Sequence, residues 1–128
     1  MSISAYRAVA VNTLPREMWP SAAYTTVVGF IGQAQRAMER GDIQAAHDSL
    51  VRAQQVVAVL RGSLQPDQAG ISTKLSALYD YVSSELGQAN VTKDAARLQS
   101  LGAILLPLRD AWEAAGRSAQ RGSGGGQG

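Results

Sequence analysis

The chain contains no cysteine, one histidine and only 5% aromatic residues among its 128 positions. Without cysteine it forms neither a disulfide nor a thiolate metal site, which excludes disulfide-stabilised secreted domains and cysteine-based zinc modules. The scarcity of aromatic residues, together with frequent alanine and leucine, argues against a sandwich of β-branched strands. The composition therefore predicts one all-α domain with a single hydrophobic core.

Charge and long apolar runs are also scarce. The formal net charge is only +2, and no segment concentrates enough lysine and arginine to displace many phosphate counterions, so nucleic-acid binding is not indicated. No segment approaches the ~20 apolar residues that span a membrane, and no N-terminal stretch has the pattern of a signal peptide. We therefore expect a cytoplasmic protein that does not insert into membranes.

Catalytic chemistry has little support in this sequence. His47 has no second metal ligand at helical spacing and no neighbouring nucleophile. The ten acidic residues are scattered, and the glycine-rich C-terminal stretch lacks the Lys-Ser/Thr pair of a phosphate loop. We therefore expect no catalytic, cofactor-binding or metal-binding residue, and we expect His47 to be a surface or half-buried residue.

Helical periodicity is present in four segments that helix breakers separate. Apolar residues recur at spacings of three and four, the period of a helix that buries one stripe. Two stripes are almost continuous, at positions 71, 75, 78, 82, 86 and 89 and at positions 98, 101, 105, 108, 112 and 115. The expected helices cover about 15–40, 43–62, 71–90 and 93–115. Because their connections are short, we predict an antiparallel up-and-down four-helix bundle over residues 15–115.

Residues typical of helix ends lie between these segments. Gly41 suits the left-handed conformation after a helix, and Asp42 suits an N-cap. Thr92 is the candidate N-cap of the last helix, with Asp94 favourable to the helix dipole in its first turn. Pro107 predicts a bend inside that helix, because proline removes a backbone hydrogen bond.

The two ends of the chain have a different character. Residues 1–14 lack a long period and end before Pro15, which predicts an N-terminal arm or short cap helix. The glycine-rich residues 116–128 have almost nothing to bury, which predicts a disordered tail. The part from Gly122 onward is equally compatible with an engineered linker.

More residues are apolar than one buried stripe per helix requires. On the first helix these additional apolar residues form a second row. On the second and fourth helices they lie beside the row of apolar residues that is expected to be buried. Such a wide apolar face either serves the core of the bundle or forms a groove that takes an amphipathic helix from another chain. The residues are Tyr24, Val28 and Ile31, then Val51, Val56, Val59 and Leu60, then Ile104 and Leu106.

An ordered set of motifs extends over about residues 6–115. The motifs are Tyr24 before Phe30-Ile31-x-Gln33-Ala34, Gly41-Asp42-Ile43, Leu50-x-x-Ala53-x-x-Val56-Val57-x-x-Leu60, Leu78-Tyr79-Asp80-Tyr81-Val82, Ala89-Asn90, Asp94, Leu98 and Leu108-Arg109-Asp110-Ala111-Trp112. Together they resemble the flagellin-specific secretion chaperones, the FliS family. Three residues depart from the family pattern: Thr25, where an acidic residue is usual, Pro20 and Pro107.

The resemblance implies an antiparallel four-helix bundle that acts in the cytoplasm as a chaperone and needs no cofactor. In this family the disordered C-terminal segment of flagellin wraps around the bundle and becomes partly helical. Binding prevents premature polymerisation and keeps flagellin competent for type III export. A contact with an export-gate component, and a monomeric or homodimeric state, stay open. The alternative is a helical-bundle adaptor or regulatory module that binds another amphipathic helix.

The apolar surplus and the resemblance together give a candidate flagellin-binding set. Its members are Tyr6, Tyr24, Val28, Ile31, Val56, Val59, Leu60, Tyr79, Tyr81, Ile104 and Leu106. Two alternatives stay open for the tyrosines. Tyr6 either competes with flagellin for the apolar surface or only anchors the end of the chain. Tyr79 and Tyr81 either pack and hydrogen-bond within the bundle or contact the client. Trp112, on its apolar stripe, is expected in the core.

Overall fold

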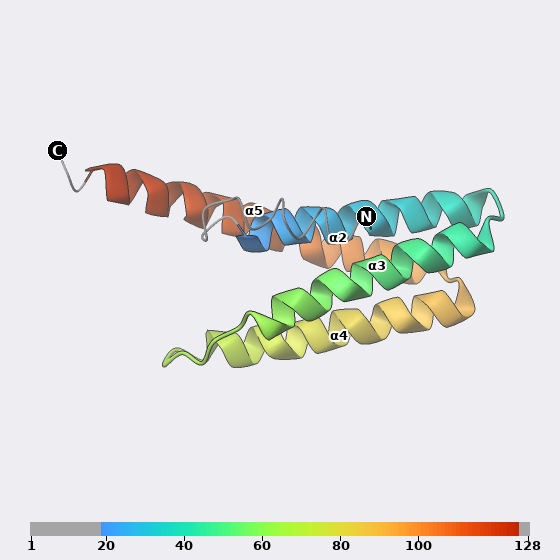
Figure 1. Cartoon of the computed structure of the whole chain (residues 1–128), viewed down its shortest axis with the longest axis horizontal. Helices are drawn as coiled ribbons and strands as arrows, with labels where there is room; N and C mark the ends of the chain where they lie inside the picture. Colours follow the sequence, from blue (N-terminus) through green and yellow to red (C-terminus); the bar gives the residue numbers. More distant parts are fainter. Residues whose placement is uncertain (1–18, 126–128) are drawn as a thin grey trace, which may run out of the picture.

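Four long helices make up most of the computed structural model, which describes residues 19–125 and the side chains of residues 20–118. The helices are α2 (Trp19–Glu39), α3 (Ile43–Gly62), α4 (Ile71–Thr92) and α5 (Ala95–Gly125) (Figure 1). No strand occurs among these residues. The prediction of an all-α helical bundle is therefore confirmed. None of the described helices is long and apolar enough to cross a membrane.

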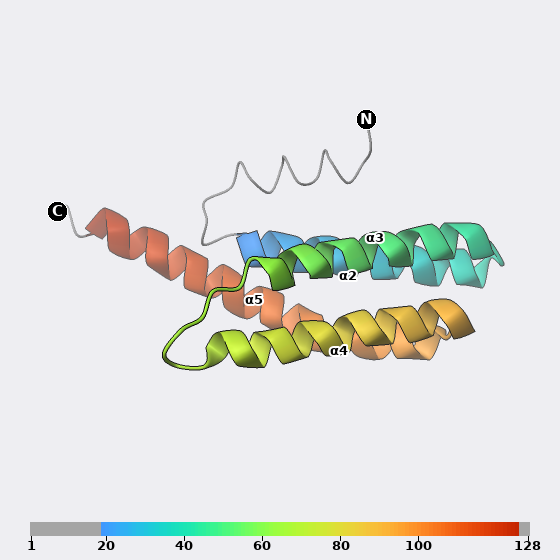
Figure 2. The same ribbon diagram turned by 60° about the horizontal axis from the view of Figure 1, so that its bottom comes forward.

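Successive helices run antiparallel and form a ring. α2 packs on α3, α3 on α4, and α5 returns between α4 and α2 (Figures 1 and 2). The α4–α5 pair packs least closely of the four. Figure 2 shows α5 beside α4 near their connection and diverging from it further along the chain. The bundle is therefore less tightly closed between α4 and α5 than elsewhere.

The core follows the predicted stripes through the middle of each helix. Burying one such side chain stabilises the fold by roughly 1.5–3 kcal/mol, so these rows supply the main driving force for folding. On α5 the first three residues of the predicted stripe, at positions 98, 101 and 105, are fully buried. The principal core residues are Ala23, Tyr24, Val27, Phe30, Ile31 and Ala34 on α2, Leu50, Ala53, Val57 and Leu60 on α3, Tyr79, Val82, Leu86 and Ala89 on α4, and Leu98, Leu101 and Leu105 on α5.

The predicted stripes fail near helix ends. Ile43 and Ile71 begin α3 and α4, and they are 66% and 52% exposed because they lie at the edge of the bundle. Four residues of the predicted stripes on α4 and α5 are only half-buried, because these two helices diverge there (Figure 2). They are Leu75, Leu78, Leu108 and Trp112, all packed against the edge of the core.

Two of the residues predicted at helix ends are confirmed in that role, and the predicted N-cap Thr92 is wrong. Gly41 has a φ of 74°, and the Asp42 carboxylate caps α3 by accepting the Ala45 N–H at 3.1 Å. Thr92 is not the N-cap of the last helix, because α4 continues through it. The cap is instead Asp94, whose carboxylate accepts the backbone N–H groups of Ala96 and Arg97 at 3.0 and 3.4 Å.

The C-terminal end of the bundle also differs from the sequence prediction. α5 continues to Gly125, whereas the predicted helix ended at residue 115 and a disordered tail began at residue 116. Arg117, Ala119 and Gln120 have favourable helix propensities, and a helix satisfies its backbone hydrogen bonds within its own segment. Pro107 lies inside α5, as predicted, and α5 departs from α4 in the part of the helix that follows (Figure 2). The predicted arm, residues 1–14, lies outside the described residues.

Candidate functional site

Two buried tyrosines meet between α2 and α4. The hydroxyl oxygens of Tyr24 and Tyr79 lie 2.5 Å apart and share a hydrogen bond, and Trp112 on α5 donates a second hydrogen bond to Tyr24. Burial raises the pKa of the Tyr79 hydroxyl, and the hydrogen bond to Tyr24 raises this pKa further. Burial also raises the pKa of Tyr24, which its two hydrogen bonds partly offset. Both groups therefore stay protonated, and the packing interpretation of Tyr79 is confirmed.

Four members of the candidate flagellin-binding set are part of the core. The sequence left open whether they serve the core or a docking surface, and their side chains are 6% exposed or less, so no partner reaches them while the bundle keeps this form. The reason is that α2, α3 and α4 each pack between two neighbours, so apolar residues beside the main row of a helix also become buried. These residues are Tyr24, Ile31, Leu60 and Tyr79.

The other members of the set are accessible, except for Tyr6, which lies outside the described residues. Val28 and Val56 are half-buried and pack against the edge of the core. The remaining four are exposed, with values between 37% and 69%. They are Val59, Tyr81, Ile104 and Leu106.

Two of these exposed residues flank the line where α4 and α5 meet. The Arg97 guanidinium of α5 donates to the Glu85 carboxylate of α4 at 2.9 and 3.1 Å, which identifies the sides of the two helices that face each other. Tyr81 lies one helical turn before Glu85, and Ile104 lies two turns after Arg97, so both belong to these facing sides. With the half-buried Leu78 and Leu108, they form an apolar surface that we call the α4–α5 seam.

The structure does not bring the whole accessible set together. Leu106 is two residues from Ile104, which places it about 200° further around α5 and away from the seam. Val59 lies on α3 and therefore outside the seam. On this helix Arg61, two residues further, points toward α4, since it forms an ion pair with Asp80 at 2.6 Å. The predicted contact residues therefore occupy several faces of the bundle: Tyr81 and Ile104 share the seam, whereas Val56 and Val59, three residues apart, share a face of α3.

Polar motif residues that sequence reasoning left without a partner join α3 to α4. The Asn90 side-chain nitrogen lies 3.0 Å from Nδ1 of His47, and Lys93 donates to the Asn90 side-chain oxygen at 2.6 Å. His47 is exposed, as expected. Among the described residues, no group of three His, Asp or Glu side chains is placed to hold a metal ion. The Arg61–Asp80 and His47–Asn90 pairs lack a sequence signal, because each depends on the register of two separate helices.

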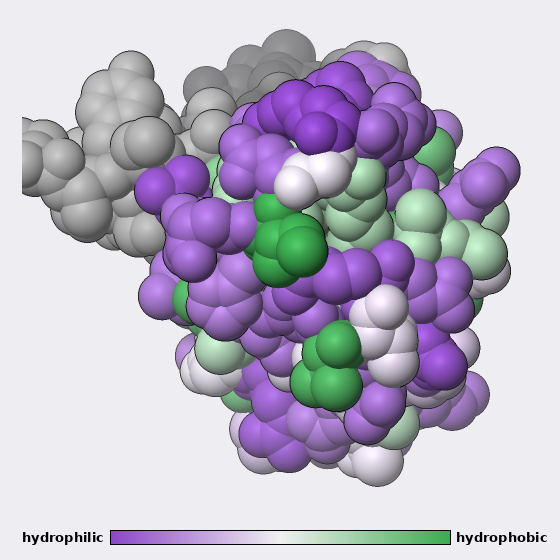
Figure 3. Space-filling model, turned by 90° about the vertical axis from the view of Figure 1, so that its right-hand side faces the viewer, coloured by the Kyte–Doolittle hydropathy of each residue, from purple (hydrophilic) through white to green (hydrophobic). Residues whose placement is uncertain are grey.

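The end of the bundle that carries the interhelical turns offers no comparable apolar surface among the described residues (Figure 3). Figure 3 shows the end with the α2–α3 and α4–α5 connections, where hydrophilic residues predominate and hydrophobic ones form separate spots. Ile43 and Val91, which adjoin these connections in the sequence, are 66% and 83% exposed. Single exposed hydrophobic residues are normal on protein surfaces and mark no binding site by themselves.

A family assignment covers almost the whole chain. The family described as flagellar protein FliS matches residues 2–119. The chain belongs to the FliS family. The flagellar secretion chaperone FliS of Bacillus subtilis is 30% identical to it over 125 residues, which cover 95% of this chain and 93% of that relative. This is a family of secretion chaperones rather than of enzymes.

Further FliS relatives come from other bacteria. The flagellar secretion chaperone FliS of Salmonella typhimurium is 32% identical over 83 residues, which cover 63% of this chain and 62% of that relative. FliS of Vibrio cholerae is 27% identical over 117 residues, which cover 88% of this chain and 86% of that relative. The resemblance that the sequence motifs indicate is therefore confirmed.

Proposed function

We propose that this protein is a cytoplasmic export chaperone that binds the disordered C-terminal segment of flagellin. Binding prevents premature polymerisation and keeps flagellin competent for flagellar type III secretion. The observation that carries this proposal is the FliS match over residues 2–119, because the relatives are named flagellar secretion chaperones. A cytoplasmic location agrees with this function, since a chaperone meets its client before export.

The α4–α5 seam supports the proposal on physical grounds. A segment that folds on binding must bury apolar surface to offset the entropy lost on ordering. Tyr81 and Ile104 are 49% and 37% exposed, and Leu78 and Leu108 below them are incompletely covered. An amphipathic helix that lies along the seam would bury all four side chains. The proposed contact set is therefore led by Tyr81 and Ile104.

The other accessible residues belong to a second part of the proposal. Val28, Val56, Val59 and Leu106 lie on other faces, and a client that wraps around the bundle would pass over several of them. Tyr6 would compete with flagellin for the apolar surface. Two further predictions concern the protein's assembly: that it contacts an export-gate component, and that it is a monomer or a homodimer.

Binding of the C-terminal flagellin peptide from the same organism tests the proposed function. We expect a 1:1 complex by calorimetry and a gain in helicity by circular dichroism. Ile104→Ser should weaken binding about tenfold without unfolding the bundle, because it removes apolar contact area from the seam. Ile43→Ser is the matched control, since Ile43 is more exposed but lies at the start of α3, outside the α4–α5 seam.

The absence of any complex with the cognate peptide would contradict this function. An equal loss of affinity in Ile104→Ser and Ile43→Ser would contradict the seam as the contact surface. Equal affinity for unrelated amphipathic helices would instead indicate a general adaptor. Deletion of residues 1–14 tests the role of Tyr6 separately. Tighter flagellin binding is expected if the arm competes, and unchanged or weaker binding argues against competition.

A further inference from the structure

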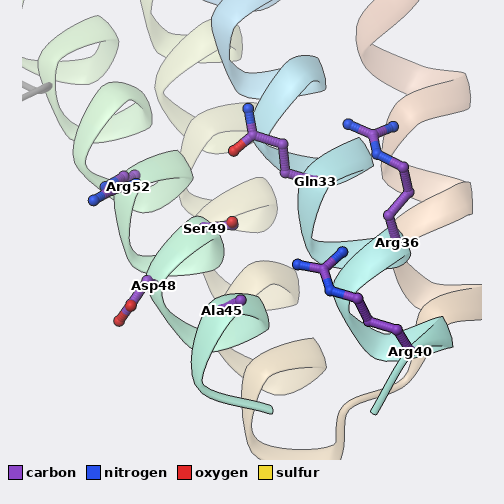
Figure 4. A pocket seen from close by; sticks show the side chains of 7 residues that line it. All are labelled: Gln33, Arg36, Arg40, Ala45, Asp48, Ser49 and Arg52. Atoms are coloured by element: carbon purple, nitrogen blue, oxygen red, sulfur yellow. The ribbon is translucent and has the colours of Figure 1, made fainter. Parts of the chain in front are cut away.

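A hollow of about 280 Å³ lies between α2 and α3, close to the turn that connects them (Figure 4). It is on the side of the ring opposite the α4–α5 seam. Ser49 is the only buried residue of its lining and therefore forms its base. The lining residues are Gln33 and Arg36 from α2, Arg40 from the turn that follows it, and Ala45, Asp48, Ser49 and Arg52 from α3.

Positive charge predominates in this hollow. The lining contains three arginines and a single carboxylate, that of Asp48, which accepts a hydrogen bond from Gln44 at 2.9 Å. The excess equals the net charge of +2 of the whole chain. Arg36 and Arg40 are one helical turn apart, a spacing at which like charges repel. The hollow therefore concentrates cationic charge on a protein that is otherwise nearly balanced.

Ion pairs within the protein neutralise little of this charge. The Arg40 guanidinium lies 3.8 Å from the Asp42 carboxylate, with both side chains largely exposed. No ion pair between described residues includes Arg36 or Arg52. Arg36 and Arg40 lie near the C-terminal end of α2, where the helix dipole favours positive charge. Arg52 lies in the middle of α3, so no helix dipole explains its position.

The size and chemistry of the hollow limit what it can hold. Its volume lies just below the 300–1,000 Å³ that is usual for small-molecule sites, so it suits one or two side chains better than a cofactor. Guanidinium groups match carboxylates in shape and charge and often bind them through two parallel hydrogen bonds. A cluster of three arginines repels metal cations, and it is too short to follow a nucleic-acid backbone.

We propose that this hollow binds an acidic segment of a protein partner, whose carboxylates interact with Arg36, Arg40 and Arg52. Figure 4 shows Arg40 reaching toward α3, with Arg36 and Arg52 on the two flanks. Binding draws these long side chains toward a common centre, which costs side-chain entropy. The interaction is therefore weak and depends strongly on salt concentration. It would give the chaperone a second docking surface, independent of the seam.

A hexaglutamate peptide with acetylated and amidated ends tests this proposal on the full-length chain. Calorimetry at low salt should show one saturable site, and the NMR shift changes should be confined to the hollow. The Arg36→Gln/Arg52→Gln variant should bind about tenfold more weakly, because it loses two charge-assisted contacts. Arg117→Gln, which removes one positive charge from an exposed position on α5, is the control for each single Arg→Gln change.

Further variants test the sign of the electrostatic effect. Asp48→Asn should tighten peptide binding, because it removes the one opposing carboxylate, whereas Glu113→Gln on α5 should not. If the double variant does not fold, Arg36→Gln alone carries the test, because Arg36 is exposed. Three results would overturn the proposal: no peptide binding, an equal loss in Arg117→Gln, or equally tight binding of hexaglutamine or inorganic phosphate.

Discussion

The Tyr24 hydroxyl on α2 lies 2.5 Å from the Tyr79 hydroxyl on α4, and Trp112 on α5 donates to the same Tyr24 oxygen. This polar contact joins three of the four helices inside an otherwise apolar core. Tyr79 and Tyr81 stand two residues apart in one motif but have different roles. Tyr79 is 2% exposed and holds the bundle together, whereas Tyr81 is 49% exposed and is free to contact a partner.

Removal of either buried hydroxyl should destabilise the bundle. Tyr79→Phe is expected to lower the free energy of unfolding by about 1–3 kcal/mol, because it takes a partner from the buried Tyr24 hydroxyl. Tyr24→Phe should have a similar effect. The double variant should cost less than the sum of the two, since both changes remove the same hydrogen bond. Urea denaturation measures these differences. Tyr81→Phe is the control, and additive losses would contradict a shared hydrogen bond.

The same tyrosines should make the fold sensitive to alkaline pH. Burial raises the pKa of Tyr79 and of Tyr24 above the ordinary tyrosine value, and that value, about 10, applies to the unfolded chain. Below about pH 10 both states hold these protons and the stabilisation is complete. Above it the unfolded state loses protons first, so stability falls by up to about 1.4 kcal/mol per pH unit for each tyrosine.

Urea midpoints measured from about pH 9 to about pH 12 check this dependence. The Tyr24→Phe/Tyr79→Phe variant should lose stability less steeply over the same range, because it has neither buried hydroxyl. Tyr81→Phe should retain the steep dependence of the unmodified chain. Equal slopes for the double variant and the unmodified chain would show that other groups cause the alkaline sensitivity.

Much of the bundle could be predicted because a helix fixes the spacing of its buried face. Val82, Leu86 and Ala89 are buried as the period requires. The period does not determine which of two adjacent apolar rows a neighbouring helix covers. In the first half of α4 the core position belongs to Tyr79, whereas Leu78, one residue earlier, is only half-buried beside α5.

The candidate surface was less predictable than the fold for the same reason. Tyr24 and Ile31 belong to a second apolar row on α2, and that pattern fits a core face as well as a docking face. Contacts between helices were not predictable either. The pairing of Arg61 with Asp80 requires the register of α3 against α4, which no local pattern in the sequence specifies.

Two glycines should respond oppositely to the same substitution. Gly41 has a φ of 74°, so Gly41→Ala should destabilise the protein by about 1 kcal/mol by placing a side chain in the left-handed region. Gly29 lies inside α2, where an added Cβ would meet no atom of a neighbouring element within 4 Å. Gly29→Ala should therefore stabilise by about 0.5–1 kcal/mol through higher helix propensity. Thermal unfolding compares them, and a shift of the same sign in both variants would contradict these conformations.

The start of α5 provides a test of where its N-cap lies. Asp94→Ala removes the acceptor for the Ala96 and Arg97 N–H groups and should cost about 1 kcal/mol, whereas Asp94→Asn keeps an oxygen there and should cost little. Thr92→Ala should change stability by less than about 0.5 kcal/mol, because the Thr92 hydroxyl only donates back to the Gln88 carbonyl within α4. Chemical denaturation of the three variants distinguishes the two positions. A large loss of stability in Thr92→Ala, with none in Asp94→Ala, would show that Thr92 is the N-cap of α5. In that case α4 would end before Thr92, and the α4–α5 connection, which sets the register of the seam, would begin earlier.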